Sequence, residues 1–397
     1  MVGEMSLVMR LKMLLFGSTL VCIYLQRNVH FKLFTMKKLV WLLSVILVVA
    51  CSDSVDLVET NGVLRLSRVD CIAQTSDQGL LIAGVFDNKV TLIKTDADFR
   101  IVWTKTDYDW GTLLSSSGWG SSFYLATVNG LYPQNGGGYV CSVSVLQGGC
   151  VVNGSTLLAR LDNQGIQVAK TEVSGSYSSL ASGPGYLLWG PSLMGLDSSF
   201  GRLWTKSLET NYSLTRMIVA TDAGFAATGT YNSDQIFLKK YNSTGNETAS
   251  YTYTRNGVSI DEGGFDIRQL SDKGFLIAGR TRKATPPYNI ACQILRTNQN
   301  GDTLWTRRFG AASNEWFDQI LSVNSNEYVV KGTRGFPPEN SHTILMRLDG
   351  DGNVKDSLTT ESLQLHTSLN NNYCIKVQTV DANRVRLSKV GLSDLFH

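Results

Sequence analysis

Two short stretches of the sequence bring carboxylates close together. DEGGFDIRQL contains Glu262 and Asp266, and NEWFDQILSV contains Glu315 and Asp318. A pair of carboxylates can divide the roles of general acid and general base, as it does in glycoside hydrolysis. The two stretches share one pattern, which is also expected of side chains that form structural hydrogen bonds at the start of a strand. We therefore predict a structural role for both pairs, with catalysis by Glu262 and Glu315 as the alternative.

The segment from Tyr108 to Gln134 is rich in aromatic residues, glycine and serine. Aromatic rings on loops can stack on the faces of sugars or hold a peptide. Trp110, Trp119 and Tyr132 are the candidates for such contacts. Burial between strands is the alternative for them, and we expect residues 123–124 to begin a strand and to pack in this way.

Residues that commonly bind metals are sparse. After residue 50 the histidines are His342, His366 and His397, in different parts of the chain. A metal site or a catalytic triad needs several such groups to converge, so we predict no metal and no cofactor. The stretch DGDGNVKD, which begins at Asp349, alternates oxygen donors as a calcium loop does. The same position elsewhere reads NQNGD or DNQG, so we interpret it as a tight turn.

The cysteines after Cys51 show no C-x-x-C spacing and therefore predict no zinc site. They are Cys71, Cys141, Cys150, Cys292 and Cys374. Cys141 and Cys150 flank a glycine-rich stretch and could form a disulfide in an oxidising compartment. For the other three we expect small buried side chains, which is also the alternative for this pair.

The segment MKKLVWLLSVILVVACSD, at 36–53, has the layout of an export signal. Two lysines precede an apolar run from Leu39 to Val49, which as a helix of roughly 18 Å is too short for a hydrocarbon core of about 30 Å. The end of the run, VVAC, resembles the lipobox of bacterial lipoproteins. That resemblance implies acylation of Cys51, which would become the first residue of the mature chain and anchor it to a membrane. An ordinary secretory signal is the alternative.

The signal begins 35 residues into the chain, which predicts that translation starts at Met36 and that residues 1–35 are an upstream extension. The expected organisation is a signal peptide at 36–50, a lipidated tether at 51–61 and a single domain at 62–397. The leader contains six of the 36 Lys and Arg residues and one of the 33 acids. The remainder has 30 basic and 32 acidic residues, a net charge of −2 that gives no basic footprint for nucleic acid.

An internal repeat occupies the rest of the chain. SDKGFLIAGRT, SDQGLLIAGVF and TDAGFAATGTY are the clearest copies, and GGGYVCSVS, GPGYLLWGP, SNEYVVKGT and NNNYCIKVQ are fainter. A second phrase follows each copy except the last, as in LIKTDADFRIVWTKT and ILRTNQNGDTLWTRR. Trp103, Trp204 and Trp305 in these second phrases are 101 residues apart each time.

Seven copies at a mean spacing of about 49 residues predict an all-β fold, a seven-bladed β-propeller of four-stranded blades. The seventh unit lacks its last strand, whereas GVLRLSR, at 62–68, precedes the first unit. We predict that Val63 to Leu66 pairs with residues 384–392. Such an N-terminal strand would close the ring and remove an exposed sheet edge.

The phrases resemble the D-G-G-[YF]-[IL]-[IVL]-A-G and L-x-[KR]-[TL]-[DN]-x-x-G-x-x-x-W-[TS]-[KR] repeats of Bacteroidetes surface and secreted β-propeller proteins, over residues 62–392. The resemblance implies the architecture and no particular chemistry, because this scaffold carries binders, assembly platforms and enzymes. With the lipobox, it implies a protein anchored to the bacterial outer membrane through Cys51, on the periplasmic or the cell-surface side. We predict a non-catalytic binding or interaction module with a glycan or an envelope protein as partner. The alternative is a propeller hydrolase or lyase that acts on glycans.

Overall fold

The computed structural model divides into two units, residues 1–55 and 56–397. In the first unit it describes β1 (Leu14–Phe16) and β2 (Thr19–Val21), which pair as an antiparallel hairpin. In the second it describes 58–59 and 63–396, except 88, 107, 109, 111–122, 135–136, 149–152, 183–184, 233, 254–261, 283–288, 311–313, 325–326, 336–340, 362 and 368–372. The export signal, Cys51 and Trp119 therefore lie outside the described residues.

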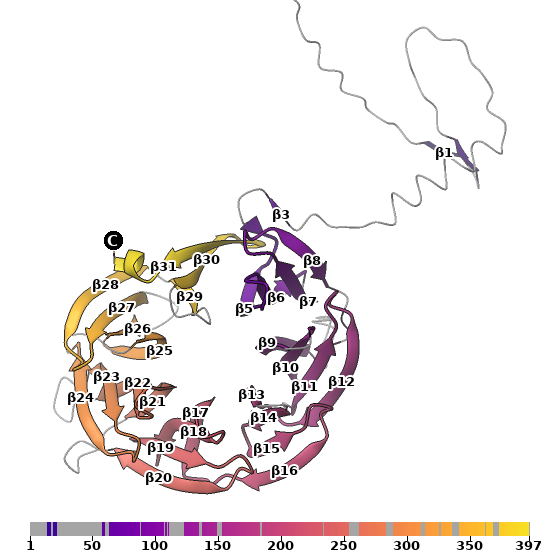
Figure 1. The fold of residues 1–397 in the computed structure, drawn as a ribbon. Coiled ribbons are helices and arrows are strands. Elements are labelled where there is room, and N and C mark those ends of the chain that lie inside the picture. The colour runs from indigo at the N-terminus through magenta and orange to yellow at the C-terminus, as the bar shows by residue number, and fades with distance from the viewer. Residues whose placement is uncertain are drawn as a thin grey trace, which may run out of the picture. The chain divides into compact units, whose positions relative to one another are not determined.

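Seven antiparallel sheets, the blades, are arranged in a ring around a central axis (Figure 1). Blade one contains β5 (Arg68–Gln74), β6 (Leu80–Phe86), β7 (Lys89–Thr95) and β8 (Ile101–Lys105). Blade two contains β9 (Phe123–Pro133), β10 (Tyr139–Gly148), β11 (Asn153–Leu161) and β12 (Gln167–Ser174). Blade three contains β13 (Ser178–Ser182), β14 (Gly185–Trp189), β15 (Ser192–Leu196) and β16 (Arg202–Ser207). β9 contains Phe123 and Tyr124, which the sequence predicted to lie in the first strand of this unit.

Blades four to six repeat the same order, from an innermost to an outermost strand. Blade four contains β17 (Tyr212–Val219), β18 (Phe225–Tyr231), β19 (Gln235–Tyr241) and β20 (Glu247–Tyr253). Blade five contains β21 (Gly263–Gln269), β22 (Phe275–Arg282), β23 (Ile290–Thr297) and β24 (Thr303–Phe309). Blade six contains β25 (Glu315–Val323), β26 (Glu327–Arg334), β27 (His342–Asp349) and β28 (Val354–Glu361).

Blade seven joins the two ends of the ring. It contains β29 (Gln364–Thr367), β30 (Tyr373–Asp381), β31 (Arg384–Gly391) and, from the start of the domain, β4 (Val63–Leu64) and β3 (Val58–Glu59). Leu64 lies opposite Val385, and Val63 lies opposite Arg386. This pairing confirms the predicted closure, with a shorter strand than expected. The short 3-10 helix η1 (Ser393–Phe396) follows, and no helix among the described residues is long and apolar enough to span a membrane.

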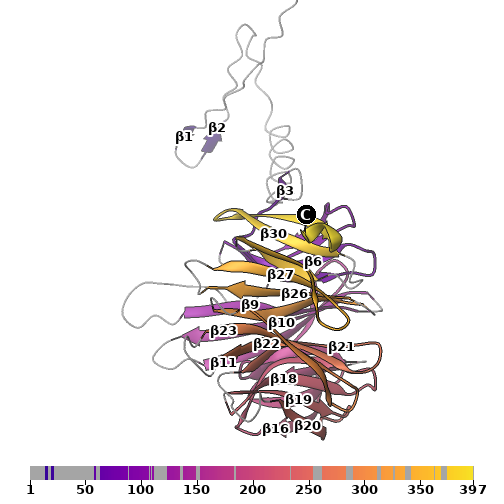
Figure 2. The ribbon, with the colours of Figure 1, turned by 90° about the vertical axis from the view of Figure 1, so that its left-hand side faces the viewer.

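The core lies between neighbouring blades, where the middle strands are covered on both faces. β22 shows this most clearly, since Phe275, Leu276, Ile277 and Ala278 are all fully buried. An uninterrupted apolar run is what a strand with two covered faces requires. The outermost strands, such as β12, alternate between half-buried and exposed residues instead, because one of their faces meets solvent. Figure 2 shows the blades edge-on.

The turn between the third and fourth strands has the same hydrogen bonds in six blades. The side-chain oxygen of its first residue accepts the backbone N–H groups two and four positions further on. This first residue is Asp96, Asp162, Asp197, Asn242, Asn298 or Asp349. The structure thus confirms that DGDGNVKD forms a turn.

Candidate functional site

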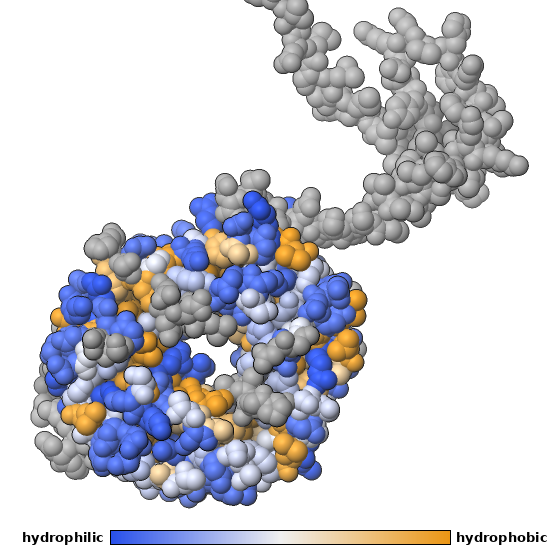
Figure 3. Space-filling view, viewed as in Figure 1, coloured by the Kyte–Doolittle hydropathy of each residue, from blue (hydrophilic) through white to orange (hydrophobic). Residues whose placement is uncertain are grey.

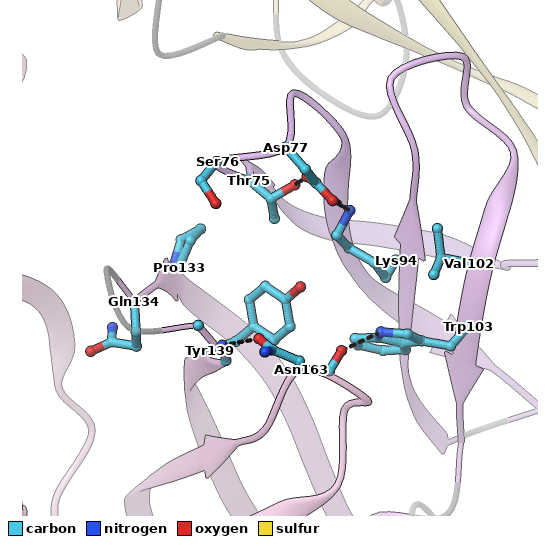
Figure 4. A pocket seen from close by; sticks show the side chains of 12 residues that line it. Thr75, Ser76, Asp77, Lys94, Val102, Trp103, Pro133, Gln134, Tyr139 and Asn163 are labelled. Carbon is cyan, nitrogen blue, oxygen red and sulfur yellow. Dashed lines mark hydrogen bonds and ion pairs between the residues drawn. The ribbon is translucent and has the colours of Figure 1, made fainter.

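A cleft of about 200 Å³ lies between blades one and two. It opens at the end of the ring that carries the turns between the first and second strands and between the third and fourth strands of the blades, such as 75–79 and 96–100, which we call the turn face. The opposite end, where one blade connects to the next, we call the connection face. Figure 4 shows the side chains that line the cleft. Those that the argument uses are Asp77, Lys94, Trp103, Gln134, Tyr139 and Asn163.

An ion pair forms one wall of the cleft. The ammonium group of Lys94 is 2.8 Å from Asp77 Oδ2, and the Asp77 side chain is 60% exposed whereas that of Lys94 is only 4% exposed. Partial burial alone would raise the pKa of Asp77. Hydrogen bonds from Lys94, Thr75 and the N–H of Gly79 outweigh burial and lower the pKa of Asp77 to about 2. Asp77 therefore stays ionised and accepts hydrogen bonds in the cleft, and the buried ammonium of Lys94 balances its charge.

Two aromatic rings form the floor. The indole N–H of Trp103 donates to the backbone oxygen of Asn163 at 2.9 Å. Tyr139 lies edge-on to Trp103, with 6.0 Å between the ring centroids, and its hydroxyl points toward Lys94 and Asp77 in Figure 4. Burial, followed by the charge of Asp77, raises the pKa of Tyr139, so its hydroxyl stays protonated. The rings are held in place before any ligand arrives.

Two glycines of the neighbouring turn, Gly137 and Gly138, line the cleft. Gly138 precedes Tyr139 and has a φ of +80°, a conformation that suits glycine. At the junction of blades five and six, Glu327 occupies the same place before Tyr328, and its carboxylate lies 3.4 Å from Arg347. A glycine at this point of the turn thus distinguishes the first junction from the later one.

The lining suits a small, neutral and polar group. Drug-sized ligands occupy pockets of about 300–1,000 Å³, so a cleft of about 200 Å³ fits something smaller, such as one sugar ring. The amides of Gln134 and Asn163 both donate and accept hydrogen bonds, and Asp77 accepts them. The Trp103 ring offers an apolar surface beside these groups, a combination that matches the mixed surface of a sugar.

The two glutamates considered for catalysis are buried and paired within their own blades. Glu262 accepts a hydrogen bond from Thr281 at 2.8 Å and lies 3.5 Å from Arg308. Glu315 accepts one from Arg334 at 2.7 Å. A general acid or base must reach the substrate, either directly or through one water. The contacts of Glu262 and Glu315 are therefore those of structural residues, which is the role that we predicted from the sequence.

The aspartates of the same two stretches also hold strands in place. Asp266 accepts the backbone N–H of Ile320 from the next blade at 2.8 Å. Asp318 accepts hydrogen bonds from Lys331 at 2.9 Å and from Thr333 at 3.1 Å. Only Asp318 is partly exposed, so the two stretches do not present a pair of accessible carboxylates.

Among the aromatic candidates, Trp110 belongs to the core. It is 1% exposed, stacks on Tyr108 with 4.1 Å between centroids, and donates its indole N–H to Gln167 at 2.5 Å. A ring enclosed in this way cannot contact a ligand. The prediction of ligand contact by Trp110 is therefore wrong, and the alternative of burial holds. Tyr132 is half-buried against the core between blades two and three. Trp119 lies outside the described residues.

Four cysteines are described, and all four are free thiols. Cys141, Cys292 and Cys374 are buried, and Cys71 is half-buried. Cys141 therefore agrees with the alternative of a small buried side chain. Its proposed disulfide partner, Cys150, lies outside the described residues. No group of three metal-binding side chains occurs within the described part of the chain.

Sequence reasoning did not find the cleft, because most of its residues occupy ordinary repeat positions. The pair formed by Asp77 and Lys94 recurs as Asp272 and Arg296 in blade five, and Trp103 recurs as Trp305. The distinguishing signal is the run of three glycines at 136–138, which no other copy of this turn contains.

The fold defines the class: this chain is a seven-bladed β-propeller. No family model matches the sequence, and no curated protein matches it. Among solved structures, the propeller domain of the Trilobed protease from Pyrococcus furiosus is 8% identical, with a TM-score of 0.42 over 64% of this chain and 80% of that one. A virginiamycin B lyase from Staphylococcus aureus is 11% identical, with a TM-score of 0.48 over 84% and 97%. The WD40 domain of SCAP from fission yeast is 10% identical, with a TM-score of 0.40 over 83% and 86%. These similarities concern the fold alone.

Proposed function

We propose that this protein is a lipid-anchored propeller of the bacterial envelope that binds a neutral glycan without catalysis. The cleft between blades one and two carries this proposal. Its aromatic floor is fixed by the hydrogen bond from Trp103 to Asn163, and polar groups surround that floor. Such a site can recognise a sugar ring with little loss of side-chain entropy.

The charge of the cleft supports a neutral ligand. Asp77 is ionised but faces Lys94, so the two charges cancel locally. A cationic ligand would compete with the buried ammonium for the carboxylate, and an anionic ligand would meet the exposed carboxylate first. Hydroxyl groups can instead donate to Asp77 and accept from the amides of Gln134 and Asn163.

Anchoring to the membrane rests on the sequence before the domain. The lipobox-like VVAC places Cys51 after an apolar run, and acylation is worth about 0.8 kcal/mol per buried methylene. When the full chain is expressed in a bacterium fed labelled palmitate, we expect label in the protein and none in Cys51→Ser. Equal labelling of both proteins would remove the lipid anchor from the proposal.

Binding can be tested with a panel of neutral and acidic polysaccharides. We expect saturable binding of a neutral member without release of products, and at least a tenfold loss of affinity in Trp103→Ala. Trp305→Ala is the matched control, because Trp305 occupies the same repeat position and packs on Gly352 as Trp103 packs on Gly165. Turnover that Glu315→Gln abolishes would instead establish the hydrolase or lyase alternative.

A further inference from the structure

Two ion pairs at the turn face expose their acidic partner. In blade one the exposed fraction is 60% for Asp77 and 4% for Lys94. In blade five it is 55% for Asp272 and 8% for Arg296. The cation is buried in both pairs, so solvent meets the carboxylate of each.

The ion pairs of Asp70 and Asp266, on innermost strands, have the opposite arrangement. Arg68 is 44% exposed, and its partner Asp70 is 2% exposed. Arg216 of blade four and Arg268 of blade five share Asp266, whose exposed fraction is 5%, whereas those of the arginines are 47% and 26%. These strands are the innermost of their blades (Figure 1) and border the central opening of the ring, which is visible in Figure 3. The opening therefore meets guanidinium groups with their carboxylates buried behind them.

The same arrangement continues onto the connection face of blades five and six. Arg334, at the end of β26, is 41% exposed, and its partner Glu315 is 3% exposed. Arg308, near the end of β24, is 29% exposed, and its partner Glu262 is 3% exposed. The two glutamates that the sequence offered as catalysts thus act as buried counter-ions that orient arginines toward solvent.

We propose that the central opening and the adjoining connection face of blades four to six form a binding site for carboxylate or phosphate groups. The arginines at its centre are Arg216 and Arg268, which share Asp266. Arg334 lies at its edge on the connection face. A guanidinium held by a buried carboxylate keeps a fixed orientation and still has further N–H donors in the same plane, which match the two oxygens of a carboxylate or phosphate. Acidic groups at this edge include Asp318, which Lys331 neutralises at 2.9 Å.

Two further observations agree with a preorganised cationic opening. Arg268 also donates to the backbone oxygen of Ile320 in the next blade at 3.2 Å, which fixes its side chain. The charge of Arg216 reaches the other side of the ring. Burial, followed by Asp70, raises the pKa of Cys71 in blade one to about 11, and Arg216 opposes that rise.

The site can be tested by calorimetry on the complete domain, with citrate and inorganic phosphate as probes at constant ionic strength. We expect saturable binding of at least one anion, and the tighter of the two identifies the preferred group. Arg216→Gln should weaken binding at least tenfold, and it leaves Asp266 paired with Arg268. Arg100→Gln is the matched control, because Arg100 is highly exposed and lies in a turn of the turn face.

This proposal is independent of the glycan-binding cleft, and its failure can be told apart from failure of that function. Trp103→Ala should bind citrate or phosphate as the unmodified domain does. The proposal is overturned if the unmodified domain binds neither anion, whatever the variants do. It is also overturned if Arg100→Gln weakens binding as much as Arg216→Gln, since general screening of charge would then account for the effect.

Discussion

At the scale of single residues, burial and partners decide what each chemically capable group does. Glu262 and Glu315 have the residue type of catalysts, yet each is buried against an arginine. Asp77 has an ordinary repeat position, yet it is exposed in a cleft and its pKa is lowered to about 2. Residue types were visible in the sequence, but exposure depends on neighbours from other blades. For this reason the sequence could predict candidates and not their roles.

The thiols provide a prediction at this scale. Burial raises the pKa of Cys141, Cys292 and Cys374, in the last case to about 12, and it raises that of Cys71 to about 11. The thiolate is the reactive form, so we expect iodoacetamide at pH 8 to leave these four residues unmodified in the folded domain and to label them in denaturant. Mass spectrometry of peptides would show this. Rapid labelling of Cys71 or Cys141 in the native state would mean that their junction is open.

At the scale of elements, the outermost strand of one blade packs on a turn of the next. Trp103 lies on Gly165, where an added Cβ would come within 2.8 Å of the indole ring. Between blades two and three, the strand carries the small residue and the turn carries the large one. Ala169 occupies the position in β12 that Trp103 occupies in β8, opposite the third strand of its blade. The turn of blade three has Phe200, with a φ of +69°, where the turn of blade two has Gly165. One large group therefore fills each of these junctions, from one blade or from the other.

This packing predicts a coupled effect of two substitutions. Gly165→Ala should lower the free energy of unfolding by about 1–3 kcal/mol, because it places a side chain at positive φ and against Trp103. In a Trp103→Ala background the same change should cost less, since the contact is gone and only the backbone strain remains. A double-mutant cycle from chemical denaturation measures this coupling. Strictly additive effects would show that the two residues do not share a contact.

The elements themselves were largely predictable. The repeat gave the strands, the turn residues and the closing strand, because these depend on local pattern and on a period that the sequence displays. The pairing of β4 with β31 followed from the same reasoning. The cleft was not predictable, since it arises where Tyr139 of one blade lies edge-on to Trp103 of another. No local sequence pattern predicts this contact between two blades.

At the scale of the whole molecule, the ring depends on the joint between its two ends. Leu64 and Leu66 are buried in one cluster with Val385 and Leu387 of blade seven and Ile82 of blade one. The strand before the first blade thus contributes to the core on both sides of the joint. The carboxylates of Asp77 and Asp272 are exposed at the turn face, whereas the guanidinium groups of Arg68 and Arg216 are exposed at the central opening.

The joint predicts how the domain responds to loss of one side chain. Leu66→Ala should lower the free energy of unfolding by about 2–5 kcal/mol, because Leu66 is fully buried. Leu304→Ala is the matched control and should change it by less than about 0.5 kcal/mol, since Leu304 is exposed on an outermost strand. Thermal and denaturant unfolding compare the two variants. Similar losses in both would mean that the closing strand carries little of the stability.

The measurement that tests the central claim most directly is the response of tryptophan indole N–H signals in NMR spectra as a neutral oligosaccharide from the binding panel is added. The account predicts a saturable shift of the Trp103 signal, because its indole forms the floor of the cleft, with the Trp305 signal unchanged. It also predicts that the oligosaccharide remains intact. A Trp103 signal that does not move while the oligosaccharide binds, or a shift of Trp305 alone, would contradict binding in this cleft.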